Sequence, residues 1–291
     1  WKVDRATSFG FMFHKVFQFN SDLSAWNVGN GVNFKSMFRD TQINSVLSAW
    51  NVGKSTDFSL MFVDTPINCD ISSWTVGNSI DFSHMFHTAT QFNSNLQNWD
   101  VSRSTRFNHM FHTATQFNSN LQNWDVSRST SFRSAFKHAS NFNDNLSRWN
   151  VGKTKDFLRM FEHASKFNSD IASWDITSGT DFSNMFHKAV SFNQNLSQWP
   201  NNNRNICNGA NNFCIGASCG FSCGTSTSLG ALNYLVIPSS QPSMPPSRKL
   251  TMGPSLQPSK SIIPSAQHYM VPSTELSLVP WMQPSILPSM G

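Results

Sequence analysis

Residues 107–126 read FNHMFHTATQFNSNLQNWDV, and variants of this stretch recur along the first two thirds of the 291-residue chain. The tryptophan of this stretch returns at a regular interval, with steps of 25, 24 and 24 residues and then five steps of 25. The series comprises Trp1, Trp26, Trp50, Trp74, Trp99, Trp124, Trp149, Trp174 and Trp199. A fixed period of this length is the signature of a solenoid, in which each repeat buries its apolar face against its neighbours.

Each repeat carries two apolar patterns. The first is spaced as on one face of a short helix. Its members in one repeat are Phe107, Met110, Phe111, Ala114 and Phe117. The second is Leu-x-x-Trp-x-Val, in which Trp and Val are two residues apart and therefore point to the same side of a strand. We predict an α/β repeat solenoid of about eight turns of 24–25 residues, with one short strand and one short helix per turn.

Composition limits the class of protein. Charged residues make up 13% of the chain, against roughly 25% in a typical soluble domain. The net charge of +5, from 21 basic and 16 acidic residues, is spread along the sequence. A nucleic-acid-binding protein is expected to concentrate its basic residues, so we predict no nucleic-acid partner. No apolar run approaches the ~20 residues of a transmembrane helix, so we predict no transmembrane span within this sequence.

An asparagine follows the last aromatic or aliphatic residue of the first pattern in all eight turns. These residues are Asn20, Asn44, Asn68, Asn93, Asn118, Asn143, Asn168 and Asn193. An amide side chain offers two donors and an acceptor, and stacked amides can bond to the backbone and to one another. We interpret the column as a structural asparagine ladder, with a ligand-binding ladder as the alternative.

The complete motif, Phe-x-x-Met-Phe-x-x-Ala-x-x-Phe-Asn-x-x-Leu-x-x-Trp, stands at residues 182–199. It resembles the BspA-family leucine-rich-repeat surface proteins, which include many mycoplasma surface repeat proteins of unknown function. In this resemblance, Leu-x-x-Trp-x-Val corresponds to the Leu-x-x-Leu-x-Leu strand of leucine-rich repeats, with Trp in place of the central Leu. It covers residues 1–200. It implies an extracellular or cell-surface protein, often adhesive, and carries over no catalytic residue.

Two segments of different composition follow the repeats, which we assign to residues 1–200. Residues 201–236 contain Cys207, Cys214, Cys219 and Cys223. A solenoid end needs a cap, and this cluster resembles the disulfide-bonded caps of extracellular leucine-rich repeats. Zinc ligation and free thiols are the alternatives, and four cysteines allow three pairings. Residues 237–291 hold 11 of the 13 prolines, mostly in Pro-Ser pairs, and we predict a disordered stalk.

No set of unlike catalytic groups stands out, because the His, Asp and Ser residues of the array have copies one turn away. A site repeated at every turn fits a binding ladder better than an active site. We therefore predict no enzyme, no cofactor and no metal site. Four histidines share one position in the repeat, namely His14, His87, His112 and His187. We interpret them as a solvated row, with metal binding between His87 and His112 as the alternative.

Two surface features suggest ligand binding. Arg103, Arg128 and Lys153 stand four residues after Trp in consecutive turns, within a segment (100–166) of ten basic and five acidic residues, or +5. We interpret this row as a docking stripe for an acidic polymer, with a neutral by-product of duplication as the alternative. The second feature is the outward side of the predicted strand. Its polar residues are Asn98, Asp100, Asn123 and Asp125.

Together these patterns predict a non-enzymatic recognition or adhesion protein that binds an extended glycan or protein through its repeats. The alternatives are a structural wall or matrix component that self-associates, and an intracellular repeat scaffold.

Overall fold

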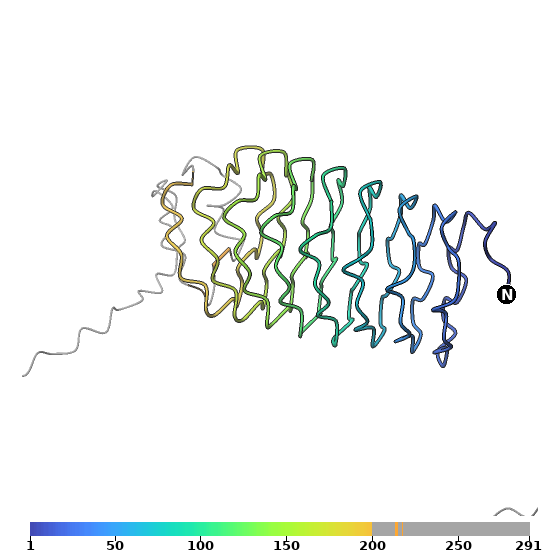
Figure 1. The fold of residues 1–291 in the computed structure, drawn as a ribbon. Coiled ribbons are helices and arrows are strands. Elements are labelled where there is room, and N and C mark those ends of the chain that lie inside the picture. The colour runs from blue at the N-terminus through green and yellow to red at the C-terminus, as the bar shows by residue number, and fades with distance from the viewer. Residues whose placement is uncertain (200–212, 215–216, 218–291) are drawn as a thin grey trace, which may run out of the picture. The chain divides into compact units, whose positions relative to one another are not determined.

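The computed structural model describes residues 1–199, 213, 214 and 217, and the first 199 residues form a stack of turns (Figure 1). From Phe34 to Trp199, the apolar residues of the two sequence patterns are buried and belong to one continuous core. Equivalent aromatic rings stack from turn to turn, as Phe86 does on Phe111 at 5.7 Å. The expected repeat solenoid is confirmed.

The predicted strand and helix are both wrong for the described residues. These residues form no α-helix and no extended strand, and consist of turns with one isolated parallel β-bridge between neighbouring turns. The bridging residues are Ser8, Asn33, Asp57, Asp81, Arg106, Ser131, Asp156 and Asp181. Each of them directly precedes the first Phe of the repeat. The inter-turn pairing therefore begins at the segment predicted as a helix and not at Leu-x-x-Trp-x-Val.

Left-handed backbone explains why the Phe-x-x-Met-Phe segment is not helical. Each turn contains two non-glycine residues with positive φ, four positions apart, such as His109 at 55° and Thr113 at 60°. An α-helix of L-residues requires negative φ throughout, so each such residue ends helical winding. The apolar spacing survives because a chain of tight turns also returns inward every three or four residues.

The same alternation aims half of the segment's N–H groups at the next turn. The N–H groups of His84 and Phe86 donate to the carbonyls of Asn108 and Met110, at 2.7 and 2.9 Å. The N–H of the intervening Met85 turns back to the carbonyl of Phe82 at 3.1 Å. Buried backbone donors are thus used both within a turn and between turns, as burial requires.

Tryptophan links the turns on another side of the coil. The indole Nε1 of Trp124 donates to the carbonyl of Leu96 in the preceding turn at 3.0 Å, and Trp149 does the same to Leu121 at 2.9 Å. The bond recurs at every turn from Trp50 to Trp199. A buried indole needs such an acceptor, and a Leu or Phe in this place lacks the donor.

The turns fan apart toward the tryptophan side. Equivalent rings in neighbouring turns are nearly parallel, so the distance between their centroids measures the local spacing of the turns. The spacing is 6.4 Å between Trp124 and Trp149, but only 4.4 Å between His84 and His109. Neighbouring turns therefore lie farther apart along the tryptophans than along the histidines.

The two ends of the described array differ. After the last turn, the carbonyl of Phe213 accepts the N–H of Phe186 at 2.9 Å, and the Phe213 ring meets that of Phe186 edge-on at 5.3 Å. Phe213 belongs to the segment predicted as a cap. At the first turn, Trp1 is 86% exposed and Phe17 is 62% exposed. The remainder of the predicted cap and the predicted stalk lie outside the described residues.

The asparagine column forms a continuous hydrogen-bonded ladder. The side-chain Oδ1 of each asparagine accepts the backbone N–H of the asparagine one turn later, over seven steps from Asn20 to Asn193. The step from Asn118 to Asn143 measures 2.8 Å. Most of these side chains are exposed, so the ladder follows an outer edge of the coil.

We expect a left-handed residue to favour glycine over alanine, opposite to the order in a helix. Thr113→Gly should be more stable than Thr113→Ala by about 1 kcal/mol, since a Cβ in the left-handed region costs about 1–2 kcal/mol. In a helix, Ala would exceed Gly by about 1 kcal/mol. Urea unfolding of both variants measures the order. The same pair at Thr115, which has no positive φ, should show the alanine variant as the more stable.

The asparagine ladder yields a second stability prediction. Asn118→Ala leaves the Asn143 N–H without its side-chain acceptor and should cost about 0.5–1.5 kcal/mol. Asn118→Asp keeps an acceptor oxygen and should stay closer to the wild-type free energy of unfolding. Urea denaturation followed by tryptophan fluorescence measures both. Equal losses for Ala and Asp would show that the Oδ1 bond contributes nothing.

Candidate functional site

The surface beside the tryptophans alternates between buried and exposed residues. Trp99 and Val101 are buried. Asn98, which precedes Trp99, and Asp100, which lies between Trp99 and Val101, are exposed. One turn later Asn123 and Asp125 are exposed in the same way. These polar side chains therefore face solvent in register, one set per turn, even though the segment is not an extended strand.

A groove of about 710 Å³ lies on this surface. Its lining comes from three neighbouring turns and includes Gly53, Asn78, Asn98, Asp100 and Arg103. The fan-like opening of the turns toward the tryptophan side leaves room for such a groove. Of the residues predicted for ligand binding, Asn98, Asp100 and Arg103 line it, whereas Asn123, Asp125, Arg128 and Lys153 lie outside it.

The groove presents both signs of charge. The hydroxyl and the backbone N–H of Ser102 hydrogen-bond to the Asp100 carboxylate and lower its pKa, so the carboxylate is ionised at neutral pH. The Arg103 Nη1 donates to the Asn78 Oδ1 at 2.7 Å, which ties the guanidinium to the turn before it. The groove thus combines an acceptor, a charged donor and amides, a set suited to hydroxyl-rich or amide-rich partners.

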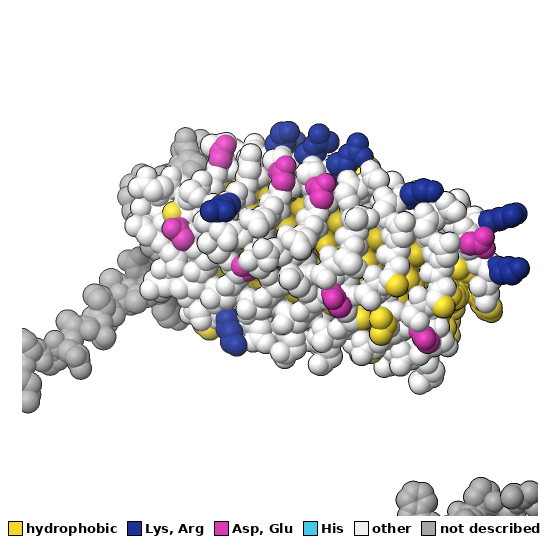
Figure 2. Space-filling model, in the orientation of Figure 1, with side chains coloured by type: hydrophobic (Ala, Val, Ile, Leu, Met, Phe, Trp, Pro, Cys, Tyr) yellow, Lys and Arg dark blue, Asp and Glu magenta, His cyan; other side chains and the backbone are white. Residues whose placement is uncertain are grey.

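The predicted basic row is fully on the surface. Arg103, Arg128 and Lys153 are all exposed, and within residues 1–199 none of the three forms a salt bridge. Figure 2 shows basic side chains gathered along one edge of the molecule, with acidic side chains beside them. The row follows the tryptophans by four residues, and the rings of neighbouring tryptophans are 6.4 Å apart, which is wider than the ~5 Å spacing of a β-ladder.

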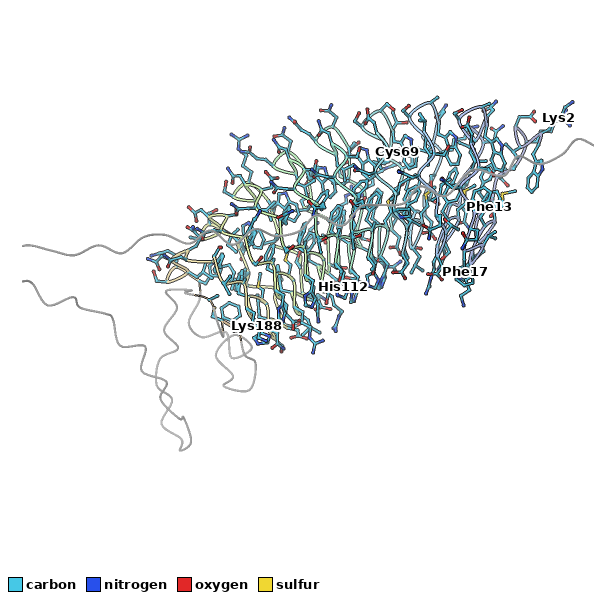
Figure 3. The ribbon with its side chains drawn as sticks, turned by 90° about the horizontal axis from the view of Figure 1, so that it is seen from below. Lys2, Phe13, Phe17, Cys69, His112 and Lys188 are labelled. Atoms are coloured by element: carbon cyan, nitrogen blue, oxygen red, sulfur yellow. The ribbon has the colours of Figure 1, made fainter. Side chains whose placement is uncertain are left out.

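The histidines are half-buried and do not form the solvated row that we expected. His84 stacks on His109 at 4.4 Å, and His87 stacks on His112 at 4.5 Å. Within each turn the two Nδ1 atoms face each other, at 3.2 Å for His84 and His87. Figure 3 shows His112 on the same long side of the array as Phe17 and Lys188.

Burial keeps these imidazoles neutral. Burial, with smaller contributions from His87 and Arg39, lowers the pKa of His84 to about 4. Burial and the neighbouring His87 and His109 lower the pKa of His112 to about 3. The rings are therefore uncharged at pH 7, and each pair can share one proton between its Nδ1 atoms.

The predicted disulfide candidates are only partly described. Cys214 is disulfide-bonded, whereas Cys207, Cys219 and Cys223 lie outside the described residues. Cys69 is a free thiol, and its burial raises its pKa to about 11. It occupies the place where Ser94 and Ser119 accept the N–H of Ile71 and Leu96. A protonated, half-buried thiol here is unreactive.

A family model described as a mycoplasma protein of unknown function, DUF285, matches residues 1–67, 42–145 and 118–218. These overlapping matches together span residues 1–218 of the 291. The chain belongs to this family. The DUF285 match covers the whole described array, and no curated protein matches the chain. In the described part of this DUF285 protein, no helix is long and apolar enough to cross a membrane.

Sequence reasoning missed one cluster in this DUF285 array. Glu162, His163 and His187 lie close enough for their side chains to meet, although they come from two turns. A signal was present in the sequence. Glu162 is the only glutamate before residue 200, and it stands in the column that holds His87, His112 and His187 in other turns.

The buried histidines predict acid sensitivity with a defined window. Their folded pKa values lie below the ordinary 6.5, so the unfolded chain binds more protons between about pH 6.5 and 4. Stability is therefore complete above about pH 6.5 and falls as the pH decreases toward 4. The melting temperature of the wild type should fall as the pH is lowered from 7.5 to 4.5. The melting temperature of His112→Asn should fall less steeply over the same range. Asp100 and similar carboxylates titrate below this window, so an identical slope in the variant would contradict the assignment.

Proposed function

We propose that this protein is a non-enzymatic recognition or adhesion protein that binds an extended partner at the groove formed by Asn98, Asp100 and Arg103. The observation that carries the proposal is the groove itself, because it lies on the surface where exposed polar side chains flank the buried Trp in neighbouring turns. An extended ligand that enters it can continue over Asn123 and Asp125, and successive weak contacts add to a usable affinity.

The chemistry of this surface favours a glycan, with a protein segment as the alternative. Amides, an ionised carboxylate and a guanidinium bond well to hydroxyl groups, and the surrounding charge is low. The exposed row of Arg103, Arg128 and Lys153 favours a partner with negative charge along its length. A sulfated or carboxylated polysaccharide meets both requirements.

We also propose that the protein is displayed outside the cell. The supporting observations are the disulfide at Cys214, which is typical of oxidising compartments, and the membership of a mycoplasma family. A relationship to BspA-type leucine-rich-repeat proteins is part of this proposal, and the 24–25-residue solenoid period supports it. Labelling of intact cells with a membrane-impermeant reagent tests the location, and labelling only after lysis would favour an intracellular scaffold.

A structural wall or matrix component is the second candidate. The observation that favours it is exposed apolar side chains on the outer surface of later turns, namely Val32, Val46 and Ile80. Exposed apolar side chains can promote self-association. Sedimentation velocity of the full chain over a range of concentrations separates the two functions, because a recognition protein stays monomeric while binding its ligand saturably.

The basic row predicts salt-dependent binding to an acidic glycan. Replacing Arg103, Arg128 and Lys153 together with Gln should weaken binding to heparin or polygalacturonate by roughly threefold to a hundredfold at low salt, since exposed ion pairs contribute about 0.2–1 kcal/mol each. The difference should vanish at high salt. A control variant with Lys2, Lys15 and Lys166 changed to Gln removes the same charge from other exposed positions. Equal losses in both variants would reduce the effect to net charge and end the docking-stripe proposal.

A further inference from the structure

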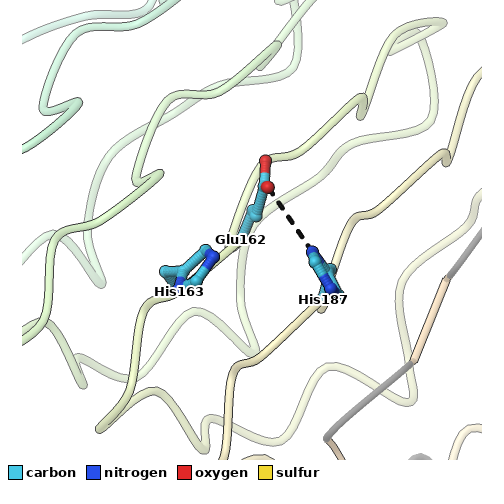
Figure 4. A group of neighbouring side chains, drawn as sticks. All are labelled: Glu162, His163 and His187. Atoms are coloured by element: carbon cyan, nitrogen blue, oxygen red, sulfur yellow. Dashed lines mark hydrogen bonds and ion pairs between the residues drawn. The ribbon is translucent and has the colours of Figure 1, made fainter.

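The cluster of Glu162, His163 and His187 departs from the repeat in a chemically specific way. Glu162 is buried, and among the described residues it is the only glutamate. Its Oε1 lies 3.5 Å from the Nδ1 of His187 (Figure 4). One ligand atom from each of the three side chains can be chosen so that all lie within 4.8 Å of one another.

The carboxylate is held by groups that leave one oxygen available. The Lys137 Nζ lies 2.9 Å and the Arg159 Nε lies 3.5 Å from the Glu162 Oε2. Both cations thus contact the same oxygen, and Oε1 faces His187. A ligating carboxylate is commonly fixed in this manner by partners on its second oxygen.

Ring orientation separates this cluster from the other histidines. The planes of His163 and His187 cross at 75°, whereas those of His84 and His109 differ by 7°. The lone pairs of imidazole lie in the ring plane. Parallel stacked rings therefore direct their nitrogens side by side, but crossed rings can direct them to one point. The stacked histidines offer at most two converging donors per turn, while the Glu162 cluster offers three.

We propose that Glu162, His163 and His187 form a binding site for a divalent transition metal ion, of which Zn²⁺ is the best match. Zinc takes nitrogen and carboxylate oxygen ligands in a tetrahedron, and bonds of about 2.0–2.2 Å set neighbouring donors roughly 3.4 Å apart. The Oε1–Nδ1 separation of 3.5 Å already has this value. Small side-chain rotations bring the third donor to the same distance, and water completes the tetrahedron.

The positive charges beside the cluster determine how strongly we expect it to bind zinc. Lys137 and Arg159 compensate the charge of the Glu162 carboxylate and repel a cation, so the site binds zinc more weakly than the same ligands would without these two positive charges. The site joins two successive turns, since His187 lies one turn after Glu162 and His163. Bound metal therefore clamps these turns together and raises the melting temperature in proportion to the logarithm of free zinc above the dissociation constant.

Zinc titration of the full chain, with its disulfides kept oxidised, tests the site. Isothermal titration calorimetry should show one more zinc ion bound to wild type than to Glu162→Gln or His187→Asn. In these variants the affinity should fall by tenfold or more, since even removing a residue that only orients a ligand costs about 10–100-fold. His112→Asn, which removes a half-buried histidine from the same column of the repeat, should leave zinc binding unchanged. Co²⁺ should give the visible absorption of a tetrahedral site in wild type and in the control only.

A measurement on the wild type alone keeps the proposal testable if a variant unfolds. Zinc should protect His163 and His187 from modification by diethylpyrocarbonate, read by mass spectrometry, and should leave the modification of His112 unchanged. Protection of all histidines alike, or of none, would overturn the site. So would zinc affinity that survives Glu162→Gln in a folded variant, because the cluster would then be an ion-pair network without a metal.

Discussion

The alternation of backbone handedness in the Phe-x-x-Met-Phe segment is the constraint on which the structure depends. Two left-handed residues per turn direct alternate N–H groups toward the next turn and fold the others back within the turn. The inward positions between them hold the Phe and Met residues of the core. Because sixteen non-glycine residues adopt this strained conformation, the inter-turn hydrogen bonds and the aromatic stacking must outweigh a cost repeated in every turn.

The period, the core and the solenoid could be predicted because the spacing of apolar residues shows directly which side chains are buried. The buried apolar residues are those of the two apolar patterns, from Phe107 to Val126 in one repeat. The local backbone could not be predicted. A helix and a chain of tight turns place Phe107, Met110 and Phe111 on the same side, so the apolar spacing does not distinguish them. The left-handed positions carry nine residue types, from His, Thr and Ser to Phe, Leu, Lys, Arg, Asp and Asn, and no recurring Gly marks them.

The candidate site divides in the same way. Alternation around Trp99 was sufficient to place Asn98 and Asp100 on the outside. The groove depends on the spacing between turns, which differs from one side of the coil to the other and has no signature in a single repeat. The Glu162 cluster depends on which residues of successive turns face each other. A consensus of the repeats does not show this cluster, because the position of Glu162 is not acidic in the other turns. Glu162 alone brings a carboxylate to His187.

Two neighbouring turns have the same sequence, since residues 84–105 and 109–130 are identical. The rings of His84 and His109, and those of Phe86 and Phe111, meet their own copies. A turn that stacks one register too far during folding therefore finds almost the same partners, and the chain between them loops out. The energetic gap that selects the native register is narrowest at this point. Elsewhere in the array the repeats differ in sequence, as around Glu162, and these differences make a shifted stacking of turns less favourable than the native one.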